Sequence, residues 1–511
     1  MKDGTVRMQI PGSAQSRKQG TAALLCQALL VFSPLLLMGA LSLFLGKNAF
    51  ASWPIWTDEQ DYWRALYNWN AVGFQTGYSG LFEVIPAAGA LSVHGVTPLL
   101  LYGWFVKLFG LSAHTIVICN AVWVSLGALV LCLLLKPRPK VSLPIALFTV
   151  TYVPMVLYTC TSMTQLFNYG LLMAYIALLL RFDRDRKPVF VILACLCVCF
   201  GCLYRINLFL LFLPLAWFLG GKRFSWRTWL WAIVGLVLAA GLYCLSASHT
   251  APYVQGFLYH FIKAETPELA FRMLLSHTKA NLIDYLTAYK VDEIQWHFRQ
   301  LYMLTMGLCL IGSFFRISRN GSKHGPRFAW NAPCLWCFLW LAGSLGIVLM
   351  LYEVMDWADF RTLAPVLWLV PVCLYLRGQR LLPGAMLAGS LALLLALCNT
   401  PNVGFFADTN RFQPPEENAD LSAAIACITY DPDATDPFDN TVRTDLSGER
   451  LLTQELAAGM GLETGWLTED SVGKSRWIIT DSLKMPLTGY DLVYEAHNAA
   501  LFRRSQPTEA P

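Results

Sequence analysis

The sequence has few charged residues. Only 14% of its 511 residues are Asp, Glu, Lys or Arg, whereas about a quarter of a soluble domain is charged. Hydrophobic residues make up 56% of the chain, and the mean hydropathy is +0.48. The apolar runs are continuous over about 17–25 residues, which suits membrane-spanning helices and excludes the alternating pattern of barrel strands. The composition therefore predicts an integral membrane protein built from helices.

Several other signals are missing. The 15 cysteines lie mostly inside apolar runs, where they act as small hydrophobic residues. Cys195-x-Cys197-x-Cys199 has no histidine partners, so the sequence predicts no metal site there. After residue 400 there is one cysteine, Cys427, so disulfides do not stabilise the C-terminal part. The basic residues are scattered over short loops, and we expect no nucleic-acid partner.

Eleven apolar segments are long enough, or nearly so, to be membrane helices. They span residues 21–45, 113–135, 141–157, 163–180, 188–204, 207–219, 228–247, 301–315, 331–351, 362–376 and 381–398. The first follows a polar, basic stretch and is too long for a signal-peptide core, so we interpret it as an uncleaved helix. The sequence thus predicts an all-α polytopic transmembrane bundle of about eleven helices.

Basic residues alternate between the two sides of these segments. The N-terminus and five short loops hold 20 of the 30 basic residues that precede residue 400, in fewer than 60 positions; the loops are 136–140, 181–187, 222–227, 316–327 and 377–380. Lys and Arg gather in short cytoplasmic loops. We therefore expect a cytoplasmic N-terminus, with the other loops and the C-terminal part outside the cytoplasmic membrane.

The charge balance also divides the chain into parts. Residues 400–511 hold 18 acidic and 8 basic residues, and the remainder holds 15 acidic and 30 basic residues. We expect these parts: a cytoplasmic tail at 1–20, a transmembrane domain at 21–398 with outer loops 46–112, 248–300 and 352–361, a linker at 399–445, and a small extracytoplasmic α/β domain at 446–511. In that domain, 448–460 has a helical pattern, and 477–480 and 490–494 have strand patterns.

The segments 188–204 and 207–219 form the least regular part of the bundle. Both flanks are basic, so the number of crossings must be even, yet 32 residues are few for two full spans. A pair of short or tilted helices that turns at Arg205 fits both facts. The arginine has two interpretations. It reaches an interface with its long side chain, or it lines a functional cavity, because charges inside membranes are costly.

The outer loop 46–112 contains two predicted helices. One begins near Thr57 and runs to about Trp69, and the other, at 98–109, is apolar but too short to span and lies in the membrane interface. Asp58 and Glu59 sit in the first turn of the first helix. They act there as capping residues that favour the positive helix end, or one of them is a general base beside a membrane-level cavity.

The other two outer loops also carry candidate residues. Loop 248–300 mixes aromatic residues with His260 and several basic residues, which is typical of an interfacial helix or of a surface for anionic lipid headgroups. Loop 352–361 concentrates Glu353, Asp356, Asp359 and Arg361. Ion pairs within the loop and contact with a substrate are both consistent with this density of charge.

Four stretches together have the order found in one known family. They are Thr57-Asp58-Glu59-x-x-Tyr62, Val96-Thr97-Pro98 to Tyr102 followed by Lys107-Leu-Phe-Gly110, Tyr204-Arg205-Ile-Asn207, and Asp359-Phe-Arg361-Thr-Leu-Ala-Pro365. In this the chain resembles polytopic glycosyltransferases of the C-type (GT-C) fold, such as the bacterial protein O-mannosyltransferases and aminoarabinose transferases. His94-Gly-Val-Thr departs from the His-Pro or Pro-Pro approach that is usual there.

The resemblance implies a function at a bacterial cytoplasmic membrane. A polyprenyl-phosphate sugar donates a glycosyl group to a glycan, lipid or protein acceptor on the outer side. By this resemblance Asp58 would be the general base with Glu59 in support, and Arg205 and Arg361 would bind the donor phosphate. Possible substrate-binding residues are Tyr62, His94, His260, Glu353 and Asp359. Some relatives use a divalent cation, but the sequence contains no convincing set of metal ligands.

Two other functions stay open at this stage. A lipid-linked oligosaccharide polymerase or ligase would require a large outer loop rich in arginine, and loop 248–300 fits this loosely. A lipid or solute transporter without bond chemistry would show internal repeats and charged or broken helices at the midplane. The sequence has no repeat, and its carboxylates lie in loops.

Overall fold

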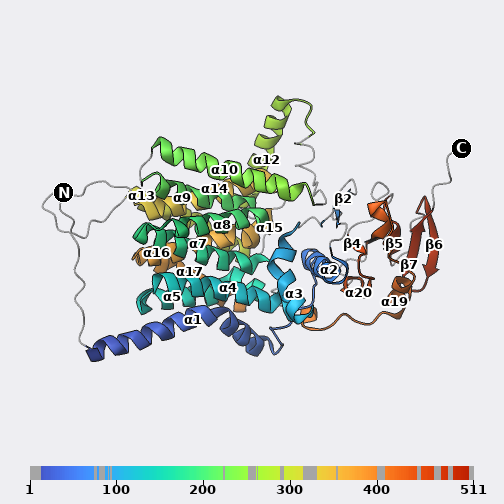
Figure 1. Cartoon of the computed structure of the whole chain (residues 1–511), viewed down its shortest axis with the longest axis horizontal. Helices are drawn as coiled ribbons and strands as arrows, with labels where there is room; N and C mark the ends of the chain where they lie inside the picture. The colour runs from blue at the N-terminus through green and yellow to red at the C-terminus, as the bar shows by residue number, and fades with distance from the viewer. Residues whose placement is uncertain are drawn as a thin grey trace.

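A helical bundle and a small sheet occupy opposite ends of the molecule, and α2 (Thr57–Val72) and α3 (Trp104–Phe109) lie between them (Figure 1). The structure is a computed structural model. It describes residues 13–73, 77–79, 87–89, 91, 95–221, 225–250, 261, 263–287, 293–314, 331–352, 355–399, 409–445, 450–464, 474–480 and 487–505.

Seven of the described helical segments are long and apolar enough to cross a membrane, or eight if one bent pair is a single span. They belong to α1 (Ser13–Leu45), α4 (Thr115–Leu135), α7 (Gln165–Asp185), α10 (Trp226–Ala247), α14 (Ala332–Leu351), η3 with α16 (Asp359–Leu363, Ala364–Leu376) and α17 (Leu381–Asn399). The bent pair is α5 (Pro139–Thr151) and α6 (Val153–Thr159), which meet at 61°. The protein is thus a multi-pass helical membrane protein, as predicted.

The remaining predicted segments are also helical, but shorter or more polar. Residues 188–219 form α8 (Pro188–Tyr204), η2 (Ile206–Leu211) and α9 (Phe212–Leu219), so the predicted turn at Arg205 is confirmed. The segment predicted at 301–315 is the C-terminal part of α13 (Glu293–Phe314). The first half of α13 carries Arg299 and other polar residues, which explains why this helix does not have the composition of a simple span.

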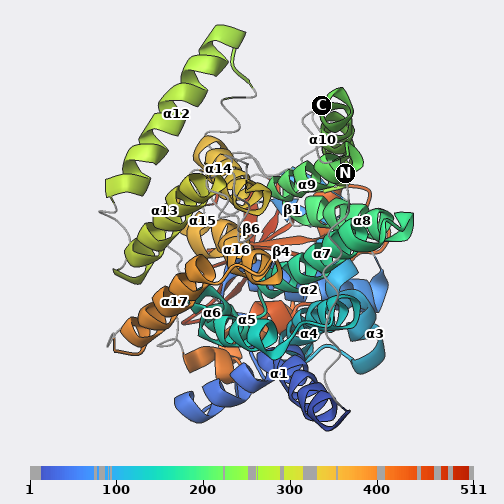
Figure 2. The same ribbon diagram turned by 90° about the vertical axis from the view of Figure 1, so that its left-hand side faces the viewer.

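Outside the bundle, short helices follow the predicted outer loops. Residues 99–109 form η1 (Leu99–Gly103) and α3, as predicted for an apolar helix too short to span. Loop 248–300 contains α12 (Pro267–Thr287), which projects from the side of the bundle in both views (Figures 1 and 2). Loop 352–361 contains α15 (Met355–Ala358) and the start of η3. The strands β1 (Gly77–Ser79) and β2 (Ala87–Gly89) form an antiparallel pair.

Helices α4 and α7 pack closely against one another. Gly127 of α4 lies against the backbone of Gly170 in α7, and a Cβ added to either glycine would collide with the backbone of the facing helix. Small residues let membrane helices approach this closely, so that their contact surfaces pack over the full length. α7 is almost fully buried, since 89% of its apolar stretch lies inside the protein.

The C-terminal part is a five-stranded sheet with helices. The strand order is β4-β3-β5-β7-β6, in which β3 pairs in parallel with β4 and β5, and β7 pairs antiparallel with β5 and β6. The strands are β3 (Thr441–Thr444), β4 (Gly461–Thr464), β5 (Trp477–Thr480), β6 (Tyr490–Glu495) and β7 (Ala500–Arg504). The shorter helices are η4 (Thr409–Phe412), α19 (Ala419–Ala426), η5 (Pro437–Asn440) and α20 (Arg450–Glu455).

This part has a hydrophobic core of its own, which includes Leu421, Val442 and Ile479. The predicted strands at 477–480 and 490–494 are confirmed, and the helix predicted at 448–460 corresponds to α20. The strand β3 lies within the range that the sequence assigned to the linker, yet it is a central strand of the sheet. Proline, aspartate and asparagine are rare in strands, so their presence on both sides of these four residues indicates a loop and masks the strand pattern.

Candidate functional site

The carboxylate of Asp58 lies against the guanidinium of Arg361, at the end of the bundle that faces the sheet. A hydrogen-bonded ion pair joins Arg361 Nη2 to Asp58 Oδ2. Asp58 stands in the first turn of α2, and Arg361 stands in η3, where the chain enters α16. The two side chains are 21% and 26% exposed, so the pair is partly open to an incoming molecule.

Arg205 lies directly beside this pair. Its Nη1 donates to the Thr362 hydroxyl at 2.7 Å and to the Tyr352 hydroxyl at 3.2 Å, and its Nη2 donates to the Tyr204 hydroxyl at 3.3 Å. The Tyr352 and Thr362 hydroxyls are themselves 2.7 Å apart. Since Thr362 follows Arg361 in the chain, these bonds bring the turn after α8 and the start of α16 together. The structure therefore places Asp58, Arg205 and Arg361 in one cluster.

Tyrosine side chains form one wall of this cluster. Tyr62 is buried one turn after Asp58, and its hydroxyl accepts a 3.5 Å hydrogen bond from Thr164, which also contacts the Tyr204 hydroxyl. Burial first, and the negative charge of Asp58 second, raise the pKa of Tyr62 well above its ordinary value. The phenol therefore keeps its proton and can act as a hydrogen-bond donor. Its predicted role in substrate binding stays a prediction.

Glu59 is completely buried, and its hydrogen bonds go to backbone groups of neighbouring turns. Its Oε2 accepts the backbone N–H groups of Ile55 and Trp56 at 3.0 and 3.1 Å, and its Oε1 accepts that of Ser162 at 2.8 Å. The first two bonds close the N-terminus of α2, in which Trp56 is the N-cap residue. Glu59 thus caps the helix and fixes the first turn that carries Asp58.

A residue that sequence reasoning missed completes the environment of Glu59. Arg411, from η4, is 2% exposed, and its Nη1 lies 3.3 Å from Glu59 Oε1 and 3.3 Å from the Ser52 hydroxyl. Its guanidinium also lies over the Trp56 ring, 4.7 Å from the ring centre. In the sequence Arg411 is an isolated basic residue in a predicted linker, which gives no signal of this role.

The η3 turn is held from its other side by a second arginine. Arg299 of α13 is 2% exposed and pairs with Asp359 through Nε and with Asp356 through Nη2, both at 2.7 Å. Asp359 is buried, so this carboxylate meets Arg299 and does not join the Asp58 cluster. Its predicted contact with substrate stays a prediction. The observed ion pairs join this loop to other segments, since its carboxylates meet Arg299 of α13 and its Arg361 meets Asp58 of α2. His94, His260 and Glu353 lie outside the described residues.

The C-terminal part is fastened to the helix that carries Asp58. Arg64 of α2 donates from Nε to the Met460 carbonyl at 3.0 Å, from Nη1 to the Leu456 carbonyl at 2.8 Å, and from Nη2 to the Ala457 carbonyl. Asn68, one turn later, donates to the Met460 carbonyl and accepts from the Gly459 N–H, both at 2.9 Å. These carbonyls follow the end of α20, so Arg64 and Asn68 hold the turn after that helix against α2. Burial lowers the pKa of Arg64 to about 9, which leaves it charged at neutral pH.

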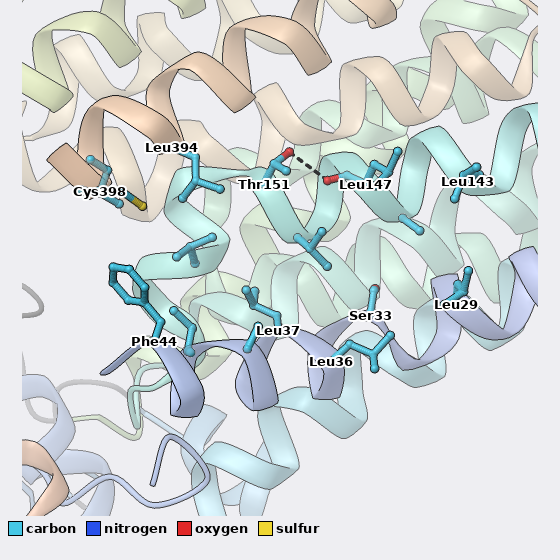
Figure 3. A pocket seen from close by; sticks show the side chains of 16 residues that line it. Leu29, Ser33, Leu36, Leu37, Phe44, Leu143, Leu147, Thr151, Leu394 and Cys398 are labelled. Atoms are coloured by element: carbon cyan, nitrogen blue, oxygen red, sulfur yellow. Dashed lines mark hydrogen bonds between the residues drawn. The ribbon is translucent and has the colours of Figure 1, made fainter. Parts of the chain in front are cut away.

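An apolar groove of about 720 Å³ runs along α1, α5, α6 and α17 (Figure 3). Val156 of α6 lines the groove, whereas Tyr158, two residues later, is close enough to Arg361 and Arg205 to interact with them electrostatically. Residues two apart on a helix point about 200° from one another. The groove and the charged cluster therefore lie on opposite faces of α6.

No cluster with the composition of a metal centre occurs in the part of the chain that the structure describes: no three or more His, Cys, Asp or Glu side chains could hold one ion. The carboxylates nearest the site are instead engaged with arginines, Asp58 with Arg361 and Glu59 with Arg411. The described site is thus built from arginines, hydroxyls and one partly exposed carboxylate, a set that suits an anionic ligand.

Fold and site together define a multi-pass helical membrane protein with an arginine- and carboxylate-containing cluster at one end of its bundle. No family model and no curated protein matches the sequence. Among solved structures, it is similar to ArnT from Cupriavidus metallidurans bound to undecaprenyl phosphate, with 11% identity and a TM-score of 0.37 over 93% of this chain and 99% of that one. It is also similar to the Archaeoglobus fulgidus oligosaccharyltransferase in the apo form, with 10% identity and a TM-score of 0.43 over 96% and 75% of the two chains.

Proposed function

We propose that the protein is a membrane glycosyltransferase that moves a sugar from a polyprenyl-phosphate donor to an acceptor hydroxyl. The observation that carries this proposal is the convergence of Asp58, Arg205 and Arg361, which come from three distant parts of the sequence. One carboxylate and two arginines are what such a transfer requires: an acceptor for one proton and cations for one leaving phosphate.

The reaction assigns each group one task. Asp58 takes the proton of the acceptor hydroxyl as its oxygen attacks the anomeric carbon of the donor sugar. The bond between that carbon and the phosphate oxygen breaks, and its electron pair leaves with the phosphate. Polyprenyl phosphate then departs as an anion with one more negative charge, which Arg205 and Arg361 stabilise. The proton remains on Asp58 until water removes it.

The position of the cluster supports an extracytoplasmic reaction. The basic loops 136–140, 181–187 and 377–380, which the structure describes, lie at the other end of the bundle, where Arg377 pairs with Asp183 at 3.0 Å and Arg181 donates to the Leu134 carbonyl at 2.9 Å. By the preference of Lys and Arg for cytoplasmic loops, that end is cytoplasmic. Asp58 and the sheet then lie on the outer side of the bacterial cytoplasmic membrane, beside the headgroups where a lipid phosphate sits.

The acceptor arrives from the aqueous side in this arrangement. Asp58 is partly exposed and belongs to α2, which lies between the bundle and the sheet (Figure 1). The lipid chain of the donor belongs among the apolar helices, and α10 offers many exposed leucine and tryptophan side chains on the bundle surface. A transporter would have its carboxylates near the membrane midplane, whereas Asp58 and Glu59 lie at the bundle end.

A turnover assay tests the proposal. Purified protein in liposomes receives a panel of polyprenyl-phosphate sugars, and the release of polyprenyl phosphate is measured. Loss of a general base lowers the rate by about 10²–10⁴-fold, so we expect Asp58→Asn to lose nearly all release. Asp183→Asn removes a carboxylate from a comparable pair at the other end of the bundle and should keep normal turnover. Wild-type turnover in Asp58→Asn would refute the assignment of the base.

A further inference from the structure

The proposed base and the proposed phosphate site share one arginine. Asp58 is bonded to Arg361, the cation that would have to meet the donor phosphate. A neighbouring arginine stabilises the charged form of a carboxylate and so weakens it as a proton acceptor. In the observed arrangement Asp58 is therefore a poor base, and Arg361 is already occupied by an anion.

We propose that Asp58 is an internal counter-ion, which the phosphate of the lipid donor displaces from Arg361, so that the carboxylate is released from this pair only when the donor is bound. The inference rests on the proposed function and adds an order of events to it. A guanidinium binds a carboxylate or a phosphate with the same pair of N–H groups, so one anion can replace the other without a change in the position of Arg361.

Arg205 provides the first binding contact for the donor phosphate. It donates to the hydroxyls of Tyr352, Thr362 and Tyr204, and to no carboxylate among the described residues. In the described part of the chain its charge is thus compensated by neutral hydroxyls and by the Tyr204 ring, whose centre lies 4.9 Å from its guanidinium. A phosphodiester with one negative charge can bind Arg205 first and then compete with Asp58 for Arg361, which lies next to Thr362 in the chain.

The charges also change in a favourable order during the reaction. Transfer of the acceptor proton makes Asp58 neutral, so it no longer competes for Arg361. At the same step the phosphate becomes a monoester, which carries about −1.5 to −2 charges at neutral pH and needs both arginines. When Asp58 later loses its proton, the carboxylate competes again for Arg361 and helps the product to leave. When no donor is bound, Asp58 stays paired with Arg361 and does not take a proton from water.

The test is a binding measurement that needs no turnover. Full-length protein in nanodiscs is titrated with farnesyl phosphate, and the affinities of the wild type, Asp58→Asn and Asp58→Ala are compared. If the pair is closed in about nine tenths of the molecules, its removal raises the apparent affinity about tenfold. Asp183→Asn is the matched control, since Asp183 also pairs with a partly exposed arginine but lies 19 residues beyond Thr164 on α7, roughly 28 Å away.

Further arms separate the sources of the effect. Farnesol, which lacks the phosphate, should bind equally to all variants. Inorganic phosphate that showed the same gain in Asp58→Asn would support the exchange with a free anion as the ligand. Arg361→Gln should weaken farnesyl phosphate binding, and the gain from Asp58→Asn should vanish in the double variant. Residual binding through Arg205 would show that the double variant itself is folded.

Three results would overturn the exchange: unchanged or weaker binding of farnesyl phosphate in both Asp58 variants, an equal gain in Asp183→Asn, or no binding in any variant. These outcomes differ from a failure of the proposed function. Tighter binding in Asp58→Asn without turnover of any lipid-linked sugar would support the exchange and refute the transferase. Turnover in the wild type with unchanged binding in Asp58→Asn would do the reverse.

Discussion

Arg64 Nε donates a hydrogen bond of 3.0 Å to the carbonyl oxygen of Met460, which lies 396 positions later in the chain. Together with the bonds of Arg64 to Leu456 and Ala457, this contact attaches the sheet-containing part to α2. The helix that carries Asp58 is therefore held from both sides, by the bundle and by the C-terminal part.

Replacement of Arg64 should release this attachment. Hydrogen bonds to charged groups contribute about 1.5–3 kcal/mol each, so we expect Arg64→Ala to lower stability by several kcal/mol and to expose 456–460 to protease. Arg64→Lys should restore part of the stability. Limited proteolysis and thermal unfolding in detergent measure both effects. Arg272→Ala, which breaks an exposed pair with Glu268, should change neither, and equal effects of the two alanine variants would contradict the prediction.

Glu59 and Arg411 should depend on each other. Removal of one partner of a buried ion pair costs about 3–5 kcal/mol because the other charge stays buried. We expect Glu59→Gln to lower the unfolding temperature strongly and Glu59→Gln with Arg411→Met to recover part of the loss. A double-mutant cycle measures this coupling. Strictly additive losses would show that the two residues, 3.3 Å apart in the structure, do not stabilise one another.

The contact between α4 and α7 should tolerate no added side-chain carbon. Gly170→Ala puts a Cβ against the backbone of Trp123, and overpacking of this kind costs about 1–3 kcal/mol. Gly39→Ala in α1 is the control, since nothing lies within 4 Å of its added Cβ. Thermal unfolding of the two variants should differ clearly. If Gly170→Ala unfolds at the temperature of the wild type, the helices do not pack as described.

Arg205 should contribute to the rate through its planar fork. Lysine keeps the charge, but its single nitrogen cannot take the places of the two guanidinium nitrogens that donate to Tyr352, Thr362 and Tyr204. Loss of one group that stabilises developing charge costs about 10²–10³-fold in kcat, and we expect Arg205→Lys to lose activity on this scale. The measurement is kcat/KM for a polyprenyl-phosphate sugar. Arg227→Lys, on exposed α10, should match the wild type. An active Arg205→Lys variant would argue for a role as a charge alone.

Much of the fold is readable from local patterns. Long apolar runs and basic loops predict the membrane helices because hydrophobic length and charge act at each segment separately. The turn at Arg205 was also predictable, because a charged side chain between two short apolar runs is costly inside the hydrocarbon core and favours a turn at the membrane surface. Strand β3 was not predictable. Its four residues are too few to show a periodic pattern among turn-forming neighbours, and its place in the sheet depends on pairing with β4 and β5.

The site is readable only in part, for a related reason. Asp58, Arg205 and Arg361 were singled out as candidates by their unusual positions and by a family resemblance, but nothing in their spacing says that Arg361 would be bonded to Asp58. The roles of Arg64, Arg299 and Arg411 depend on contacts over 57 to 396 positions. Sequence periodicity reports which face of an element is buried, and it carries no information about such distant partners.

The membrane part depends on Arg411, a residue that follows its last apolar helix in the chain. A chain cut after α17 would retain all the candidate membrane spans among the described residues, so its hydropathy profile would suggest a complete membrane domain. It would nevertheless leave a buried carboxylate at Glu59 without its cation, directly beside the turn that presents Asp58. Attempts to study the helices in isolation should therefore keep the chain at least to Phe412, or they will examine a protein whose first outer helix has lost its anchor.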